Sequence, residues 1–475
     1  MTPRFRSIEA LSADIKSNSS AIVEFVSDAL SGLDSIGREL KAVVHVATDH
    51  ALEKAAYLQT HGRRISGNTA SELFGIPVAH KDLYMRTGWP CEGGSKVLVG
   101  HRADRTAFAV TRLDFAGAVD CARLTSVEFG LGTTGHNGYA GTPLNPWNRE
   151  YICGGSSSGS AAVVAAGIVP ASLGSDTGGS VRLPAAACGL VGIKPTHGLI
   201  SRSGVIALSP TLDTVGPLTR SVRDAAIMLN AVAGIDRDDA VSIRVKSPDY
   251  TSGIEDGISD VRIGWPRNHF FEDADAAVAD QVAGVFALAG QLGAHCVDVE
   301  VPGVETANAM TMLIIAVEGV ALHERALLES HELFNAQSLA RLLVGAFIPA
   351  RDYHNALANR EHTARRVLDE TFHHVDVLVT PVWPYPLPTI ADSDVGASPG
   401  AAAMVLRSGH NTRPANYLGF PAVTVPTGFD ANGLPASVQL IGAPFSEACL
   451  LRVARALERE LDFWSARPKL DTLTG

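Results

Sequence analysis

The sequence lacks the features that would carry a chain out of the cell or into a membrane. Its N-terminal stretch, MTPRFRSIEALSADIK, has basic residues but no apolar core of signal-peptide length. We find no apolar run that approaches the about 20 residues of a membrane-spanning helix. We therefore expect a cytoplasmic protein without a membrane partner. The cysteines are widely spaced and form no CxxC pair, which argues against a disulfide framework or zinc site and favours free, buried thiols: Cys91, Cys121, Cys153, Cys188, Cys296 and Cys449.

Concentrated charge and metal-binding patterns are also missing. The net charge is −11, both signs are spread along the chain and no basic patch is present, so we expect no nucleic-acid partner. The 16 histidines form no HExxH motif and no paired metal spacing. We therefore expect no metal and no cofactor, and we interpret His80, His136 and His197 as hydrogen-bonded core residues.

What the sequence does have is apolar content and an alternation of strand and helix patterns. With 475 residues and 46% hydrophobic content, the chain can bury a large core. Strand-like runs alternate with segments of helical spacing, which predicts an α/β layer structure, and the last two runs flank a turn at 430–433. The predicted strands are 75–84, 117–125, 261–264, 375–381, 421–429 and 436–442, and the predicted helices include 21–30, 47–59, 106–115, 221–233, 275–292, 303–372 and 447–461.

One stretch organises the rest of the chain: residues 154–180, GGSSSGSAAVVAAGIVPASLGSDTGGS. The small side chains of 161–166 predict a buried helix that packs close to its neighbours. Glycine-rich loops flank this helix, and their free N–H groups can form an anion-binding concavity. Because serines lie in the same loops, the stretch can present a nucleophile and an oxyanion hole together.

Three residues are candidates for nucleophilic catalysis. Ser180 follows two glycines, where backbone N–H groups can converge on a developing oxyanion, and Ser156 lies in the other glycine-rich loop. Lys81 ends an apolar run, and burial there would favour a neutral lysine that acts as a base. Taken alone, each serine could instead cap a turn, and Lys81 could form a surface pair with Asp82.

Two other patterns allow different interpretations. The run from Gly130 to Gly135 matches the dinucleotide-binding GxGxxG pattern, but no clear βαβ unit follows it. A GxSxG pattern is centred on Ser157, which would make Ser157 the nucleophile of an esterase-like hydrolase. That mechanism needs a later acid and histidine, for which Asp376 and His410 are the candidates.

At these residues the chain resembles the amidase signature family. The match runs from the 154–180 stretch through VRLPAAACGLVGIKPTHGLISRSG, and GIPVAHKD matches the lysine motif of the family. Flanking blocks also match: GTPLNPW, SPTLDTVGPLTRS, VDVLVTP and NYLGFPAVTVP. The resemblance covers about residues 70–240 and 370–460.

The resemblance implies a Ser–cis-Ser–Lys triad that works through an acyl-enzyme. Ser180 matches the nucleophile, Ser156 the serine after a cis peptide bond, and Lys81 the base. The N–H groups of the nucleophile loop would hold the oxyanion. The remaining expected site residues are Thr177, Gly178, Gly179, Gly130 and Gly132 at the oxyanion and substrate, with Ser157, Asp176 and Arg182 as supporting residues.

The fold that the resemblance implies is a single α/β/α domain over 1–475, with a mixed sheet of about eleven strands covered by helices. We expect a helical N-terminal segment at about 1–65 and a signature core at 70–240. A variable helical cover at 300–372 and a C-terminal core at 373–465 would follow. Family resemblance also implies a homodimer.

The expected activity is hydrolysis of the C–N bond of a small carboxamide, or of a related hydrazide or carbamate. Aromatic side chains expected near the pocket favour an apolar or aryl acyl group. The alternatives are the glutamine-hydrolysing subunit of a tRNA-dependent amidotransferase, whose middle segment this chain does not closely follow, an esterase that uses Ser157, and a binding protein without activity. The residues expected around the pocket are Tyr84, Trp89, 130–137, 312–315, Phe347 and Trp383.

Overall fold

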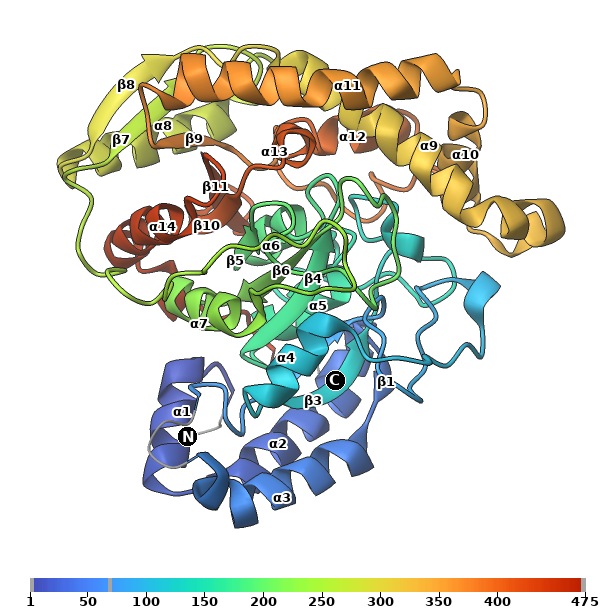
Figure 1. Ribbon diagram of the computed structural model, residues 1–475, viewed down its shortest axis with the longest axis vertical. Helices are drawn as coiled ribbons and strands as arrows, with labels where there is room; N and C mark the ends of the chain where they lie inside the picture. Colours follow the sequence, from blue (N-terminus) through green and yellow to red (C-terminus); the bar gives the residue numbers. More distant parts are fainter. Residues whose placement is uncertain (1–3, 67–70, 471–475) are drawn as a thin grey trace.

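The computed structural model describes residues 4–66 and 71–470, and its centre is one mixed sheet of eleven strands (Figure 1). The first three residues of the predicted N-terminal segment, and residue 70, lie outside the described residues. In spatial order the strands are β1-β3-β2-β4-β6-β5-β10-β11-β9-β7-β8. Sheet and helices form one α/β domain, as the family resemblance implies. The strands are β1 (Val43–Val46), β2 (Pro77–Lys81), β3 (Val119–Leu124), β4 (Ala171–Asp176), β5 (Val191–Lys194), β6 (Thr214–Thr219), β7 (Arg262–Pro266), β8 (His295–Val299), β9 (Val377–Pro381), β10 (Ala422–Phe429) and β11 (Pro435–Gly442).

The directions of the strands place the lysine motif and the serine-bearing loops at one edge of the sheet. β2 is parallel to both β3 and β4, with His80 beside Leu173. The carboxyl ends of β2 and β4 therefore open on the same side, and the loops that follow them can meet there. β10 and β11 form the predicted antiparallel hairpin.

Helices surround the sheet, and most follow the predicted boundaries closely. The Ser7 hydroxyl accepts a hydrogen bond from the Ala10 N–H and so caps the first helix. α7 and α14 pack on the central strands, and α8 packs on β7, β8 and β9. The helices are α1 (Ile8–Ser17), α2 (Ala21–Gly32), α3 (Thr48–Ser66), α4 (Phe108–Phe115), α5 (Ser158–Ala165), α6 (Arg182–Cys188), α7 (Val222–Val232), α8 (Ala276–Gln291), α9 (Val304–Ser330), α10 (Ala336–Gly345), α11 (Ala350–Val367), α12 (Ala401–Ser408), α13 (Arg413–Leu418) and α14 (Glu447–Leu461).

The small-residue helix predicted at 161–166 is α5, and every residue of it is buried. A Cβ at Gly159 would lie 2.5 Å from the Ala42 carbonyl oxygen and 2.6 Å from the Thr125 carbonyl oxygen. Only glycine therefore lets the helix approach these two backbone segments. This close packing fixes the direction in which the preceding serine loop enters the helix.

Our predictions missed the edge strands β1 and β8, and β1 interrupts the N-terminal segment that we expected to be helical. They also missed β4, β5 and β6, which lie at the centre of the sheet. Their sequences, ASLGSD, VGIK and TVGPLT, are short or rich in small residues, without the β-branched alternation that marks a strand. Gly216 of β6 illustrates the reason, because a Cβ there would lie 1.9 Å from the Ile193 carbonyl oxygen of β5. Only glycine fits between these two strands, although strand propensity favours larger side chains.

The predicted cover at 300–372 is helical and consists of α9, α10 and α11 (Figure 1). Among the described residues, the segment Val304–Leu333 is long and apolar enough to cross a membrane by length and composition, and it contains an 18-residue window with a mean hydropathy of 1.3. The expectation that no apolar run reaches this length is therefore wrong. α9 packs on α10, α11 and α13, which accounts for part of its apolar surface. A single such helix is weak evidence for a membrane span.

Candidate active site

The lysine motif and the first serine loop meet at the edge formed by β2 and β4. Lys81 is the last residue of β2, and Ser156 lies in the loop before α5. The Lys81 Nζ donates a hydrogen bond to the Ser156 Oγ over 2.6 Å and another to the Ser175 Oγ over 2.8 Å. The peptide bond between Gly155 and Ser156 is cis. The structure thus joins two of the three predicted catalytic side chains directly.

The environment of Lys81 favours its neutral form. Its side chain is completely buried, and this burial lowers the pKa of Lys81 to about 7, although the charges of Asp213 and Asp176 oppose the shift. A lysine with such a pKa is partly neutral near pH 7 and can accept a proton. The alternative of a surface pair with Asp82 is wrong, because both side chains are buried and Asp82 accepts hydrogen bonds from backbone N–H groups at 92 and 94.

Ser180 lies in the loop between β4 and α6, and Asp176 shapes this loop. The Asp176 carboxylate accepts hydrogen bonds from the Gly179 N–H at 2.8 Å and the Val181 N–H at 3.1 Å. Gly179 has a φ of +127°, a conformation that strongly favours glycine. Ser180 is 6% exposed and borders a cavity of about 730 Å³.

Arg182 braces the same loop from inside the protein. Its guanidinium contacts both oxygens of Asp176, at 2.9 and 3.0 Å, and donates to the side chains of Gln439 and Asn416 at 2.6 Å each. Burial would raise the pKa of Asp176, but the charge and hydrogen bonds of Arg182 outweigh burial and hold this pKa well below its usual range. The pair therefore ties the loop to α13 and β11.

Ser157 also supports the loop, and the esterase-like triad does not form. The Ser157 Oγ donates to the Ser180 carbonyl oxygen over 2.6 Å. Asp376 forms an ion pair with Arg262 at 2.8 Å, and His410 stacks on the ring of His269. Because each of these side chains has other partners and neither bonds to Ser157 among the described residues, the triad that the GxSxG interpretation needs is not formed.

The GxGxxG segment forms a wall of the site rather than a dinucleotide loop. Gly130 has a φ of +78°, and a Cβ there would lie 3.5 Å from the Ser156 Oγ and 3.9 Å from the Lys81 Nζ. Gly132 borders the same cavity. Gly130 brings the backbone close to the two candidate catalytic side chains, and both glycines lie beside the cavity.

The cavity in front of Ser180 has a volume of about 730 Å³ and a mostly apolar lining. Its floor consists of the glycine loops and the nucleophile loop, including Thr177 and Gly178. Helices α9, α10 and α12 supply most of the remaining wall, including Met312, Leu313, Ile315, Ala316, Val344, Ala402, Val405 and Leu406, and Ile348 adds to it from the turn after α10. The expected contribution of 312–315 and of the 130–137 loop is present in part.

The aromatic residues expected around the cavity are absent from its lining. Tyr84 is buried and donates to the Gly174 carbonyl oxygen, and Trp89 lies between His45 and the guanidinium of Arg123. Phe347 is 86% exposed outside the cavity, and Trp383 donates to the Leu183 carbonyl oxygen in a separate cluster. The structural reason for expecting an aryl acyl group is therefore wrong.

Two arginines that our sequence reasoning did not single out line the cavity. Arg341 donates to the Leu131 carbonyl oxygen, and Arg413 donates to the Leu406 carbonyl oxygen. In residues 4–66 and 71–470, neither guanidinium lies within 4.0 Å of a carboxylate. Burial lowers the pKa of both, and the charge of Arg341 helps to lower the pKa of Arg413 to about 10. Arg341 lies among apolar residues in LARLLVGA, which was its only sequence signal, whereas Arg413 follows the polar residues HNT and carries no such signal.

With the fold and this geometry in view, the chain can be assigned to a class. It is a hydrolase that acts on carbon–nitrogen amide bonds, and it belongs to the Amidase family, whose model matches residues 24–451.

Individual relatives match over nearly the whole chain. The chain is 35% identical to a glutamyl-tRNA(Gln) amidotransferase subunit of Trichlorobacter lovleyi, over 98% of this chain and 99% of the relative. The crystal structure of the corresponding amidotransferase subunit from Thermotoga maritima has a TM-score of 0.79 and 30% identity over 96% of this chain and 94% of that one. A structure described as a vestigial protein complex, revealing the origins of an s-triazine catabolic enzyme, has a TM-score of 0.89 and 32% identity over 98% and 100%.

These comparisons correct the expected partners. The amidotransferase relatives are named as subunits of a glutamyl-tRNA(Gln) amidotransferase. The expectation of a homodimer that needs only a small-molecule substrate is therefore wrong, because these relatives are subunits that assemble with other proteins. The matches also cover the middle segment, which we had taken as a departure from the amidotransferase subunits.

Proposed function

We propose that this chain is the amide-hydrolysing subunit of a protein complex, with Ser180 as the nucleophile and Lys81 and Ser156 as its proton relay. The observation that carries this proposal is the hydrogen bond from the buried Lys81 Nζ to the Ser156 Oγ, next to Gly130 of the cavity lining. Relatives named as subunits support the assembly with another protein.

The relay would work through two hydroxyl groups. Neutral Lys81 takes the proton of Ser156, which takes the proton of Ser180 as the Ser180 oxygen attacks the amide carbon. The N–H groups of Thr177, Gly178 and Ser180 would stabilise the oxyanion, whereas the Gly179 N–H already donates to the Asp176 carboxylate. The proton then returns through Ser156 to the leaving nitrogen, the C–N bond breaks, and water releases the acid from the acyl-enzyme by the same relay.

Glutamine is the first candidate substrate, because the relatives named above are amidotransferase subunits. The arginines of the cavity suit its α-carboxylate, since a guanidinium binds a carboxylate with two parallel hydrogen bonds. A buried guanidinium without a carboxylate partner is costly, and an anionic substrate would remove that cost on binding.

One observation favours a second candidate, a carboxamide that bears a carboxylate but no ammonium group. Among the described residues that line the cavity, none is an aspartate or glutamate. An α-ammonium group would therefore lack a carboxylate partner there. The apolar wall fits an uncharged carbon chain instead.

Ammonia release from glutamine and from glutaramate, the same acid without its amino group, separates the two candidates. Faster release from glutamine supports the amidotransferase function, and release at least tenfold faster from glutaramate supports the second candidate. The chain is assayed alone and with the proteins that co-purify with it. If no amide is consumed and a fluorophosphonate forms no adduct at Ser180, the proposed function is wrong.

A further inference from the structure

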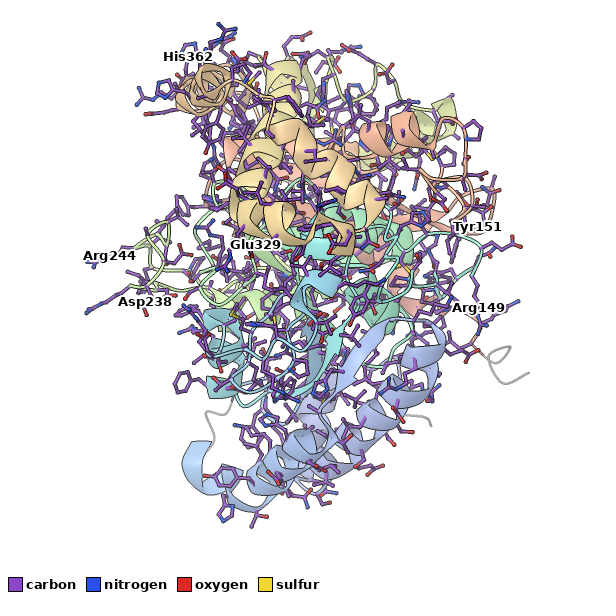
Figure 2. All side chains as sticks on the ribbon, turned by 90° about the vertical axis from the view of Figure 1, so that its right-hand side faces the viewer. Arg149, Tyr151, Asp238, Arg244, Glu329 and His362 are labelled. Atoms are coloured by element: carbon purple, nitrogen blue, oxygen red, sulfur yellow. The ribbon has the colours of Figure 1, made fainter. Side chains whose placement is uncertain are left out.

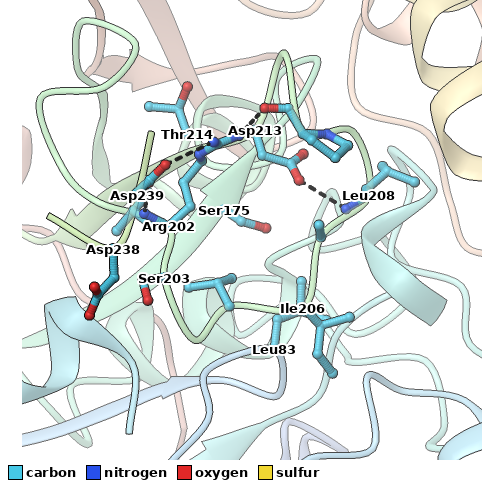
Figure 3. A pocket seen from close by; sticks show the side chains of 14 residues that line it. Leu83, Ser175, Arg202, Ser203, Ile206, Leu208, Asp213, Thr214, Asp238 and Asp239 are labelled. Atoms are coloured by element: carbon cyan, nitrogen blue, oxygen red, sulfur yellow. Dashed lines mark hydrogen bonds and ion pairs between the residues drawn. The ribbon is translucent and has the colours of Figure 1, made fainter. Parts of the chain in front are cut away.

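A second cavity lies on the Ser175 side of Lys81, with a volume of about 180 Å³ (Figure 3). Its floor includes Ser175 at the end of β4 and Thr214 and Val215 of β6, all of which are buried. Its rim includes the exposed residues Pro210 and Asp238. Figure 2 shows Asp238 projecting from the outer surface of the molecule. The cavity therefore connects the outside to the neighbourhood of the catalytic lysine.

The catalytic groups lie between the two cavities. Ser180 borders the substrate cavity, and Ser175 borders the second one. Lys81 and Ser156 are completely buried and border neither. Leu208 lines both cavities and lies between them. A substrate that fills the first cavity would thus leave the second as the open approach to Lys81.

Ser175 is suited to pass a proton between Lys81 and the second cavity. Its Oγ accepts a hydrogen bond from the Lys81 Nζ over 2.8 Å. In the part of the chain that the structure describes, no acceptor is found for the proton of Ser175 itself. A hydroxyl can accept one hydrogen bond while it donates another, so this proton is available to a water molecule in the cavity.

The polar groups around the second cavity suit water. Arg202 pairs with Asp239 at 3.2 Å, as Figure 3 shows, and Asp238 is exposed at the rim. The Asp213 carboxylate accepts hydrogen bonds from the Leu208 and Ser209 N–H groups and from the Thr177 hydroxyl. A cavity of this size with several polar partners holds more than one ordered water.

We propose that the second cavity is a proton port, a water-filled recess through which Lys81 exchanges protons with solvent while substrate occupies the other cavity. In the forward step an N–H bond of protonated Lys81 breaks and its proton binds the Ser175 Oγ. The original O–H bond of Ser175 breaks at the same time, and that proton passes to water. The products are neutral Lys81 and hydronium, and the reverse step protonates the lysine again. This inference rests on the proposed role of Lys81 as the base.

Access to the port is tested without any need for activity. In a Ser175→Cys variant, methyl methanethiosulfonate should modify the thiol introduced at position 175, located by peptide mass spectrometry. Adding Ala207→Trp, which narrows the port, should slow this modification at least tenfold. The matched control is Ala240→Trp, an exposed position on the neighbouring loop outside the lining, and it should leave the rate unchanged. Absence of modification, or equal rates in both tryptophan variants, overturns the port.

The proton route is tested by a pH jump on chains that keep Ser175. Enzyme held at pH 6 is mixed rapidly with a fluorophosphonate at pH 8, and adduct formation at Ser180 is followed in time. We expect a lag with Ala207→Trp that is absent with Ala240→Trp, because Lys81 loses its proton more slowly. Identical time courses overturn the route. Failure of every chain to form an adduct would instead contradict the proposed function, so the two results are distinguishable.

Discussion

The catalytic edge at the carboxyl ends of β2 and β4 and the helical cover of α9, α10 and α11 differ in the burial and bonding of their side chains. At the edge, Asp176 and Arg182 are completely buried and bonded to each other and to neighbouring elements. In the cover, apolar side chains are open to solvent: Leu328 is 79% exposed and Val344 is 56% exposed. Several contacts fix the position of each of these side chains, so the edge suits chemistry that needs a fixed geometry. The cover supplies the shape and charge of the cavity and tolerates change.

The largest effect should come from the nucleophile. Ser180→Ala should lower kcat/KM by about 10³-fold or more and abolish the fluorophosphonate adduct, because no other hydroxyl at the site is expected to attack. Intact-protein mass and ammonia release measure both. Ser157→Ala is the matched control in the neighbouring loop and should keep the adduct. An adduct that survives Ser180→Ala would assign the nucleophile elsewhere.

The next largest effect concerns the free energy of unfolding, which a buried ion pair at the edge should influence more than an exposed pair elsewhere. Asp176→Asn leaves the buried Arg182 charge without its carboxylate and should cost about 3–5 kcal/mol of unfolding free energy. Asp104→Asn breaks an exposed pair with Arg105 and should cost less than about 1 kcal/mol. Thermal and urea unfolding measure both. Equal losses would contradict the difference drawn between buried and exposed pairs.

Arg413→Met should reveal how the substrate is chosen. For an amide that carries a carboxylate, we expect KM to rise roughly 10- to 100-fold, since a charged hydrogen bond is lost. For the neutral methyl ester of the same compound, KM should change little. Arg407→Met, on α12 but outside the cavity lining, serves as the control. A rise of KM that is equal for both compounds would exclude an anion site.

The pH dependence should follow Lys81. Only neutral lysine accepts a proton, and burial lowers the pKa of Lys81 to about 7. The rate of fluorophosphonate reaction should therefore fall about tenfold per pH unit below 7 and level off above it. Stopped-flow measurement from pH 5 to 9 gives the profile. A profile that is flat between pH 5 and 7 would rule out Lys81 as the base.

The smallest effect is expected in the cover. Phe347→Ser removes a ring that is 86% exposed and lies outside the cavity, so stability should change by less than about 0.5 kcal/mol. Activity should also be unchanged within about twofold, by the same reasoning on exposed positions. A loss of activity alone would show that this ring contacts the substrate or a partner.

The chemistry-bearing motifs were predictable because each occupies a short stretch of chain. The 154–180 run and GIPVAHKD indicated the glycine loops, the buried helix and the candidate serine and lysine residues. The central strands β4 and β6 were not predictable from local patterns, because their small residues are required by the close packing of neighbouring segments. The prediction of an aromatic lining was wrong for a related reason. A ring that lies near a motif in the sequence can point into the core, as the ring of Tyr84 does.

By itself, the sequence determined the α/β class and, through the resemblance of its motifs, the family, and it singled out candidate residues for amide hydrolysis, because each of these signals occupies a short stretch of chain. The tertiary structure decided which other side chains and cavities surround those residues. It brought Arg341 and Arg413 from separate helices into one cavity, and it placed Ser175 between Lys81 and a second opening. Such convergence depends on side-chain packing between elements that are distant in the chain, which no local pattern records.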